Sequence, residues 1–349
     1  MPSTTSVILS LFAAGRLAAA TSYTLEDSYT SANFFDEFTF YTGADPTNGF
    51  VDYQSASEAS ASGLAGYTQG GIYLGADYQT SNPTNGRAST RVSSNKAYTH
   101  MLLVADVAHM PVGCGTWPAL WSFGPDWPGS GEIDIIEGVN SQKSNEITLH
   151  TDEGCVMTKG TQVASTKMLA TADCGAGDGN TGCPQETVST NNFGADLNAG
   201  GGGVYAMEWT SSAISVWYFA RNGTVANQLT AASSSGVDTS NFGTPLAQFS
   251  GGSGCDIDSY FKNHNIVIDT TFCGDWAGKA AVWDADSTCS ALANTCQEYV
   301  ANNPSAFTDA YWLFNSINVY TTSGATATGS SSTPTATSSY KRRSEKYRL

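Results

Sequence analysis

The sequence predicts an all-β domain, either a sandwich or a barrel, and three observations support this fold class. Short segments rich in β-branched and aromatic residues recur along the chain, separated by clusters of Gly, Asn and Ser. Glycine is abundant, with 36 in 349 residues, which favours a turn-rich fold over a helical bundle. Apart from a possible short helix at 291–302, no stretch has helical periodicity, so strands do not alternate with helices. We therefore expect about 300 residues to form one large β-domain.

Seven segments have the composition or the alternation of strands: 98–107, 131–138, 145–150, 204–209, 214–220, 265–271 and 312–320. The fourth and fifth, joined by a short polar segment, are predicted to pair as a hairpin. The glycine run 200–203 precedes a strand and lacks a following Lys-Ser/Thr, so we interpret it as a turn rather than a phosphate-binding loop. In the last strand, Ile317 and Val319 face one side and Asn318 and Tyr320 the other, which predicts one face in contact with water.

The two ends differ in composition from the body. Residues 1–20 hold a short apolar run followed by small residues, as in a secretory signal peptide cleaved near Ala20, although no basic residue precedes the run. Residues 21–321 are predicted to form the β-sandwich domain, and residues 322–349 a flexible Ser/Thr-rich tail with a basic end. The tail has no hydrophobic stretch of the kind that directs a lipid anchor. We expect a secreted, extracellular protein, with association to the cell wall as an alternative.

The charge is sparse and negative. Charged residues make up 13% of the chain, the net charge is −16, and residues 21–320 alone hold 30 acidic and 9 basic residues. Nucleic acids and anionic membranes attract clustered Lys and Arg, so the sequence excludes both as partners. No apolar run approaches the roughly 20 residues of a membrane span. We expect a monomer.

The cysteine count is even, and all of the cysteines lie in the body. With a signal peptide, this predicts four disulfides, but the pairing is open because eight cysteines allow many arrangements. The nearest pair, Cys289 and Cys296, is a candidate for a local loop. The sequon at Asn222 predicts a glycosylated surface loop. The cysteines are Cys114, Cys155, Cys174, Cys183, Cys255, Cys273, Cys289 and Cys296.

The segment 131–138, Gly-Glu-Ile-Asp-Ile-Ile-Glu-Gly, is the most informative part of the chain. Strand alternation places Glu132 and Asp134 on one face, and a bulge at 135–136 would bring Glu137 onto the same face. The side chains can then lean to the separation of about 5–5.5 Å typical of retaining glycosidases. Because like charges raise the proton affinity of one member, such a row supplies a general acid beside an ionised nucleophile. A calcium site and a solvated strand edge are the alternatives.

Three tryptophans precede this segment within eleven residues. Flat indoles stack on the apolar faces of pyranose rings, while hydrogen bonds hold the polar edges of the sugar. We interpret Trp127, which lies between Asp126 and Pro128 in a loop, as a sugar platform. Trp117 fits a core position equally well.

In this context the acid segment resembles the active-site strand of glycoside hydrolase family 16, in particular the secreted fungal endo-1,3(4)-β-glucanases, or laminarinases. Segments 23–28, 44–53, 109–118, 148–151, 179–183, 205–208, 271–278 and 303–307 carry the rest of the resemblance. It implies a concanavalin-like jelly-roll β-sandwich with an open substrate cleft on its concave face. It also implies double displacement with retention, in which Glu132 is the nucleophile, Glu137 the acid/base and Asp134 the assisting carboxylate.

The resemblance also implies substrate-binding residues. It places His150 beside the cleaved bond, Trp121 and Trp127 on the glycone side, and Trp276 in the cleft. Arg91 is a further glycone-side candidate, although close relatives often carry another arginine where this chain has a serine at position 93. Unbulged members of the family have one residue fewer between the Asp and the second Glu, which argues against a match with them.

Glu208 is an even choice between a supporting acid in the cleft and a structural or solvated role. His100, His109 and His264 have no motif that supports a role in the cleft.

We expect no cofactor, with a structural calcium possible but not indicated. The predicted function is an endo-β-glucanase acting on β-1,3 and mixed β-1,3/1,4-glucan. Cell-wall transglycosylation and a non-catalytic glucan-binding sandwich are the alternatives.

Overall fold

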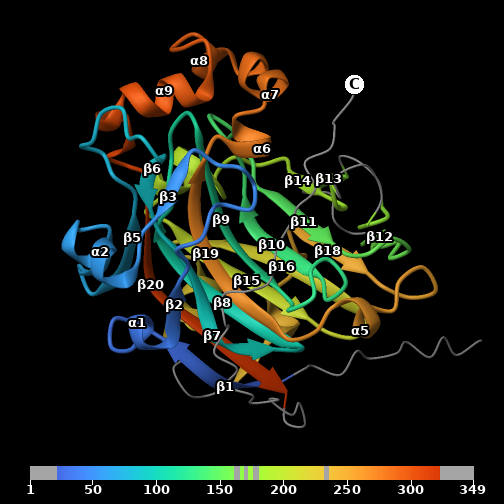
Figure 1. Cartoon of the computed structure of the whole chain (residues 1–349). Helices are drawn as coiled ribbons and strands as arrows, with labels where there is room; N and C mark the ends of the chain where they lie inside the picture. Colours follow the sequence, from blue (N-terminus) through green and yellow to red (C-terminus); the bar gives the residue numbers. More distant parts are fainter. Residues whose placement is uncertain (1–21, 161–165, 169–171, 176–180, 232–235, 323–349) are drawn as a thin grey trace, which may run out of the picture.

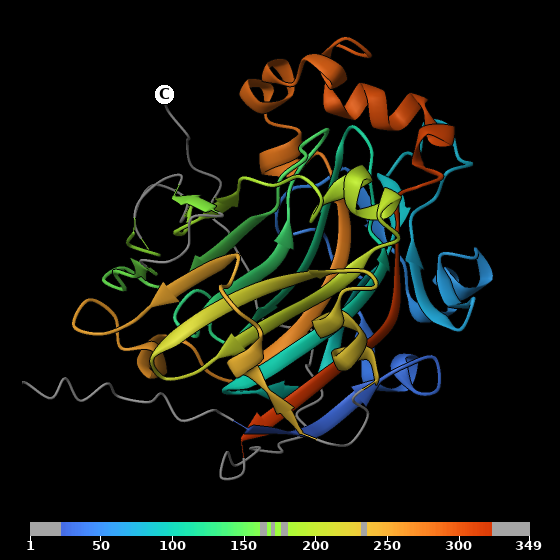
Figure 2. The ribbon, with the colours of Figure 1, turned by 180° about the vertical axis from the view of Figure 1, so that it is seen from behind.

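The computed structural model describes residues 22–160, 166–168, 172–175, 181–231 and 236–322. They form two large antiparallel sheets, one in front of the other in Figure 1 and seen from behind in Figure 2. We call the 8-stranded sheet the front sheet and the 10-stranded sheet the back sheet. The β-sandwich predicted from the sequence is confirmed. The predicted ends, 1–20 and nearly all of 322–349, lie outside the described residues.

The front sheet carries the acid segment on β10, one of its central strands. Its order is β13-β14-β11-β10-β9-β19-β7-β2. The bounds are β13 (Thr166–Met168), β14 (Gln185–Thr187), β11 (Glu146–His150), β10 (Glu132–Glu137), β9 (Thr116–Phe123), β19 (His264–Phe272), β7 (Arg91–Tyr98) and β2 (Phe38–Phe40).

The back sheet has the order β12-β18-β16-β15-β8-β20-β1-β17, with β5 paired to β20 and β4 to β5. The predicted hairpin is confirmed as β15 and β16, and the glycine run forms the turn before it. The bounds are β12 (Thr158–Lys159), β18 (Ala247–Ser250), β16 (Ala213–Ala220), β15 (Gly203–Trp209), β8 (Met101–His109), β20 (Tyr311–Thr322), β1 (Ser22–Tyr29), β17 (Val237–Asp238), β4 (Ala65–Thr68) and β5 (Gly71–Gly75). A separate parallel pair joins β3 (Val51–Tyr53) and β6 (Arg87–Ser89).

Apolar side chains from both sheets fill the space between them. Ile133, Ile135 and Ile136 of β10 are fully buried there. They pack in one cluster with residues of the back sheet such as Leu103 and Met207. The inward isoleucines therefore anchor β10 in the core, and the polar residues of this strand lie on the opposite face.

Two details of the strand prediction are wrong. The predicted strand 98–107 is two strands, because the chain turns at His100, which has a φ of 58°, between β7 and β8. The predicted wet face of β20 is covered, since Asn318 is 8% exposed and Tyr320 is fully buried. Leu229 of α4 (Thr224–Ala231) and Val237 of β17 belong to the apolar cluster that covers this face.

Short helices lie around the sandwich, and four of them form a cap at its upper end in Figure 1. The predicted helix at 291–302 begins only at Cys296, where the Thr295 hydroxyl accepts a hydrogen bond from the Glu298 amide as an N-cap. Among the described residues, no helix is long and apolar enough to cross a membrane. The cap consists of α6 (Gly274–Ala277), α7 (Ala280–Ala285), α8 (Ser287–Ser290) and α9 (Cys296–Asn302). The others are α1 (Phe34–Glu37), α2 (Ala56–Ala61), α3 (Gly194–Ala199), α5 (Ile257–Tyr260), η1 (Thr239–Asn241) and η2 (Pro304–Phe307).

All eight cysteines are paired, which confirms the predicted number of disulfides. The proposed local loop between Cys289 and Cys296 is wrong, because both cysteines bond inward from the cap to the ends of the sheets. Two disulfides join the cap to the sandwich. The disulfide with the shortest sequence separation, 9 residues, is Cys174–Cys183. The pairs are Cys114–Cys289, Cys273–Cys296, Cys155–Cys255 and Cys174–Cys183.

Candidate active site

A bulge in β10 places the three acids on one face, as the sequence predicts. Asp134 is in register with Trp121 of β9, Ile136 with Leu120, and Glu137 with Ala119. The register shift between Asp134 and Ile136 leaves Ile135 as the extra residue. Glu132, Asp134 and Glu137 are 3%, 1% and 8% exposed, so a solvated strand edge does not describe them.

Asn145, the residue directly before β11, holds the bulge. Its Nδ2 donates to the carbonyl of Ile135 at 2.8 Å, and its Oδ1 accepts from the amide of Glu137 at 2.9 Å. Both contacts are buried, so Asn145 satisfies two backbone groups next to the extra residue. No motif in the sequence singled out this side chain.

Each glutamate accepts a hydrogen bond from a tryptophan. Trp117 donates its indole N–H to Oε1 of Glu137 at 2.8 Å, and Trp127 donates to Oε2 of Glu132. The two carboxyl groups are therefore oriented by rigid aromatic donors from β9 and from the following loop. The sequence predicts neither donor role, because no local pattern reveals it, and the role of Trp127 as a sugar platform stays a prediction.

His150 lies in register with Glu132 on the adjacent strand β11. Its Nε2 is 3.2 Å from Oδ2 of Asp134, so the imidazole contacts the central acid of the row. One ligand atom each from Glu132, Asp134 and His150 lies within 4.8 Å of the others. Two carboxylates and an imidazole do not match the set of six to eight oxygen ligands that calcium takes. The donor set of this cluster therefore does not favour a calcium site.

One pocket brings most of the predicted site residues together. Arg91, Trp121 and Trp127 line it along with the acids. His150 and Trp276 are not among its lining residues, and Trp276 packs edge-on against Trp117, with the ring centres 5.4 Å apart. The sequence did not predict the contribution of the loop 45–47, or of Asp269 and Thr271 on β19. The full lining is Asp45, Pro46, Thr47, Arg91, Trp117, Ala119, Trp121, Trp127, Glu132, Asp134, Glu137, Asp269 and Thr271.

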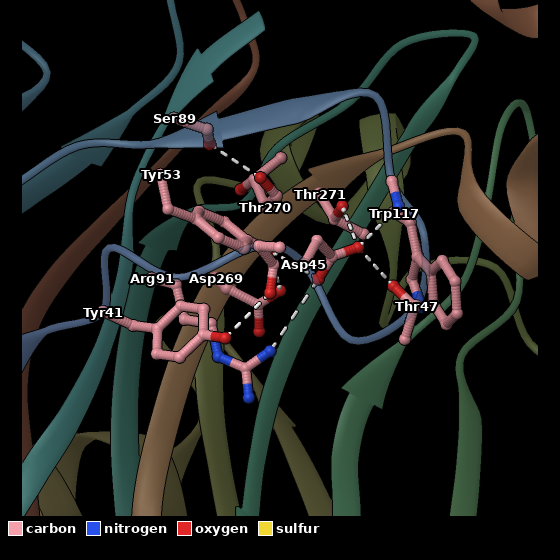
Figure 3. A network of polar contacts seen from close by, with 12 residues as sticks. Tyr41, Asp45, Thr47, Tyr53, Ser89, Arg91, Trp117, Asp269, Thr270 and Thr271 are labelled. Carbon is pink, nitrogen blue, oxygen red and sulfur yellow. Dashed lines mark hydrogen bonds and ion pairs between the residues drawn. The ribbon is translucent and has the colours of Figure 1, made fainter. Parts of the chain in front are cut away.

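A polar network forms one wall of this pocket (Figure 3). The guanidinium of Arg91 lies 4.9 Å from the ring centre of Tyr41 and 5.1 Å from that of Trp121. Its Nη1 is 3.9 Å from Oδ1 of Asp45, a side chain that is 2% exposed. Asp45 also accepts hydrogen bonds from Thr47, Thr271 and the backbone of Gly49, which fixes the loop before β3 against the sheet.

Three charged residues lie on β11, β14 and β13, the strands on the other side of β10 from β9. Strand alternation puts Glu146 on the face of His150, and Glu146 is in register with Glu186 of β14, which is in register with Lys167 of β13. Lys167 pairs with Glu186 at 2.6 Å. Burial, and then the charge of Glu186, raise the pKa of Glu146 to about 7, against the lowering effect of His150 and Lys167.

The remaining polar candidates lie outside the pocket. Glu208 accepts hydrogen bonds from Tyr23 and Thr239 on the outer side of the back sheet, so its role is structural. His264 is fully buried and bonds to Ser122 and the Ser130 carbonyl, and burial lowers its pKa to about 4. His109 stacks on Tyr311 and His100 contacts Asp258. Asn222 is exposed in the turn before α4, where its glycosylation stays a prediction.

A family model described as the XgeA-like catalytic domain of glycoside hydrolase family 16 matches residues 38–320. The chain belongs to glycoside hydrolase family 16. The family confirms the recognition that rested on the acid segment and its flanks. The bulge seen in β10 is the feature of the acid segment on which that resemblance rested.

Two sequence relatives carry the name endo-1,3(4)-β-glucanase. The chain is 45% identical over 328 residues to a probable endo-1,3(4)-β-glucanase of Aspergillus fumigatus, covering 91% of this chain and 48% of the relative. It is 42% identical to the endo-1,3(4)-β-glucanase of Arthroderma benhamiae, covering 90% of this chain and 68% of that relative. The chain thus spans about half the length of the first of these relatives and two thirds of the second.

Two solved structures of family 16 share the fold. Laminarinase 16A from Phanerochaete chrysosporium, solved with 6-O-glucosyl-laminaritriose in its donor and acceptor sites, is 43% identical, with a TM-score of 0.79. An elongating β-1,3-glucosyltransferase is 39% identical, with a TM-score of 0.76. Each alignment covers 86% of this chain and the whole of the solved chain. These structures confirm the jelly-roll fold.

Proposed function

We propose that this domain hydrolyses β-1,3-glucan and mixed β-1,3/1,4-glucan within the chain, with retention at the anomeric carbon. The bulged row of acids carries the proposal, because it presents two glutamates, each held by an indole N–H, on the floor of one pocket. The glucanase names of the relatives and the laminarinase structure support this substrate class.

The proposed reaction has two displacements at the same carbon. In the first, the carboxylate of Glu132 attacks the anomeric carbon, the glycosidic C–O bond breaks, and Glu137 gives its proton to the leaving oxygen. In the second, Glu137 takes a proton from water, the water oxygen attacks that carbon, and the bond to Glu132 breaks. Asp134 lies between them in contact with His150, and we assign it the positioning of Glu132. No step needs a cofactor.

Product analysis tests the function. The protein is incubated with laminarin, barley mixed-linkage glucan, agar and carrageenan, and the products are resolved by size and anomer. We expect a series of β-anomeric oligosaccharides from the two β-glucans. If neither β-glucan is cleaved, the enzyme assignment is wrong, and inverted products would exclude the roles of Glu132 and Glu137.

Two variants test the roles separately. Glu132→Ser should bind glucan with a loss in kcat of roughly 10³-fold or more, because the covalent intermediate cannot form. Glu137→Gln should lose about 10²–10⁴-fold, the usual contribution of general acid–base catalysis. Glu298→Gln, on an exposed face of α9, is the matched control and should cleave like the wild type.

Transglycosylation is the second candidate, and the similarity to the elongating glucosyltransferase supports it. Both reactions use the same intermediate and differ only in whether water or a sugar attacks it. Products longer than a supplied laminari-oligosaccharide would favour transfer, and products that are only shorter would favour hydrolysis.

We also propose that the protein is secreted and acts as a monomer. The signal-like residues 1–20, the four disulfides and the exposed sequon at Asn222 all suit an oxidising, extracellular compartment. Recovery of the processed, glycosylated protein from the culture medium, followed by light scattering, tests both parts.

A further inference from the structure

The pocket wall contains a buried acid that the proposed mechanism does not use. Asp269 is 6% exposed and lies on β19, in register with Ala119 of β9 and with Arg91 of β7. Ala119 is in turn in register with Glu137, so one row across the sheet runs from Glu137 through Ala119 and Asp269 to Arg91. Because neighbouring strands lie about 4.8 Å apart, the backbones of Glu137 and Asp269 are roughly 10 Å from each other.

Asp269 holds the edge of a cleft tryptophan. Trp121 is in register with Val267, two residues before Asp269, and its indole extends diagonally to donate to Oδ1 of Asp269 at 2.7 Å. Tyr53 donates to the other oxygen, Oδ2, at 3.2 Å. The carboxylate thus fixes the rotation of the Trp121 ring from behind.

Asp269 also belongs to the charge network around Arg91 (Figure 3). Arg91 lies over the Trp121 ring and near Asp45, so two acids face one guanidinium. Burial raises the pKa of Asp269 to about 6, while Arg91 and the hydrogen bond from Trp121 lower it and Asp45 raises it. Tyr53 also faces this carboxyl, Tyr41 faces Arg91, and the acids of β10 line the same pocket beyond Trp121.

We propose that Asp269 is a positioning residue for the sugar on the donor side of the cleft: it orients the indole of Trp121 and balances the charge of Arg91, two groups that line the pocket next to the acids. This inference rests on the proposed function, since it assumes that the cleft binds β-glucan. Its consequence is that donor-side affinity, rather than bond cleavage, depends on the ionisation of Asp269.

A measurement without substrate tests the contact itself. The indole N–H resonance of Trp121, identified by its loss in Trp121→Phe, is followed by ¹⁵N-edited NMR between pH 4.5 and 7.5. We expect the resonance to titrate with a midpoint near pH 6 in the wild type and to lose that transition in Asp269→Asn. A Trp121 resonance that titrates alike in both proteins would overturn the contact.

A binding measurement tests the function of the contact. In the full chain carrying Glu132→Ser, the affinity for a laminari-oligosaccharide is measured by calorimetry at pH 5 and pH 7.5. We expect Asp269→Leu to weaken binding by about tenfold or more, and Asp269→Asn, which keeps an acceptor for the indole, by about threefold or less. Affinity should fall from pH 7.5 to pH 5 with Asp269 present and stay level in both variants.

Kinetics and a control complete the test. With Glu132 intact, Asp269→Asn should raise KM and keep kcat within about twofold, as for a residue that binds ground state and transition state alike. Asp52→Asn, an exposed acid on the strand that carries Tyr53, should change neither constant. Equal affinity in wild type and in folded Asp269→Asn and Asp269→Leu would overturn the inference. A wild type that neither binds nor cleaves β-glucan would instead overturn the proposed function, whatever the NMR titration shows.

Discussion

At the residue scale, the position of Glu146 on the strand next to β10 changes the pKa of its carboxyl. It faces the same side as His150 and has Glu186 directly opposite, and like charges opposite each other on a sheet are destabilising. Lys167 pairs with Glu186, so Glu146 lies in a charged row. Burial, and then the like charge of Glu186, raise the pKa of its carboxyl to about 7.

The raised pKa predicts a stability effect with a definite sign. Because the folded protein binds this proton more tightly than the unfolded chain, the contribution of Glu146 to stability is present below pH 4.5 and is lost as pH rises through about 7. The neutral variant Glu146→Gln should therefore gain in Tm relative to the wild type as pH rises from 4.5 to 8. The gain is roughly 2–4 °C after allowance for solvent screening.

Scanning calorimetry at the two pH values measures this difference. Glu298→Gln on exposed α9 is the control and should give a difference in Tm that does not change with pH. A Glu146→Gln variant whose Tm difference is the same at both pH values would contradict the pKa of about 7.

At the scale of one element, the bulge in β10 depends on a side chain from outside the strand. Asn145→Ala would leave a buried amide of Glu137 and a buried carbonyl of Ile135 without their partner. Each such loss costs about 1–3 kcal/mol, so we expect an unfolding free energy lower by roughly 2–6 kcal/mol. Because the bulge places the Glu137 side chain on the same face as Glu132, kcat should fall by about 10²-fold as well.

Asn265→Ala provides a matched control for the bulge. Asn265 donates to the backbone carbonyl of Ser94 at 2.7 Å, beside a second register shift between β19 and β7. We expect that variant to lose stability but to keep kcat in denaturation and rate measurements. Equal kcat in the wild type and Asn145→Ala would show that the bulge does not need this amide.

At the scale of the whole molecule, two disulfides join the helical cap to the sandwich. Cys114–Cys289 closes a loop with a sequence separation of 175 residues, and the cap also packs an apolar cluster around Trp283 and Phe307. Replacing both cysteines by serine should lower the unfolding free energy by about 2–5 kcal/mol, chiefly by freeing the unfolded chain. Denaturant melts measure this loss, and cleavage of laminarin below the transition should persist because the acids lie on β10.

Replacement of the local pair is the informative comparison. Cys174–Cys183 has a separation of only 9 residues and should contribute less in the chain-entropy account. An equal or larger loss on replacing Cys174 and Cys183 would mean that native contacts, rather than loop closure, determine the effect.

The charge of the molecule gives a further prediction. A net charge of −16 repels anions and attracts cations, but a neutral glucan has no charge to be attracted. We expect kcat/KM on laminarin to change by less than about twofold between 10 mM and 500 mM NaCl, since screening removes only long-range forces. A steep loss of activity in salt would indicate a charged substrate instead.

The sequence alone determined the fold class, the number of disulfides and the three acids of β10. These follow from local rules: strand alternation sets the face of each side chain relative to its own strand, and the doubled isoleucine marks the bulge. Glu132, Asp134 and Glu137 are separated by at most five positions, so this short-range pattern was enough to place them together.

The tertiary structure decided which distant groups meet those acids. Trp121 and Asp269 are 148 positions apart. The partners of Cys289 and Cys296 are Cys114, before β9, and Cys273, directly after β19. The same holds for the covered face of β20, which is buried by segments more than 80 residues earlier in the chain. Periodicity reports the direction of a side chain but not its neighbour, because the neighbour depends on strand order and register, which the packing of the whole sandwich sets.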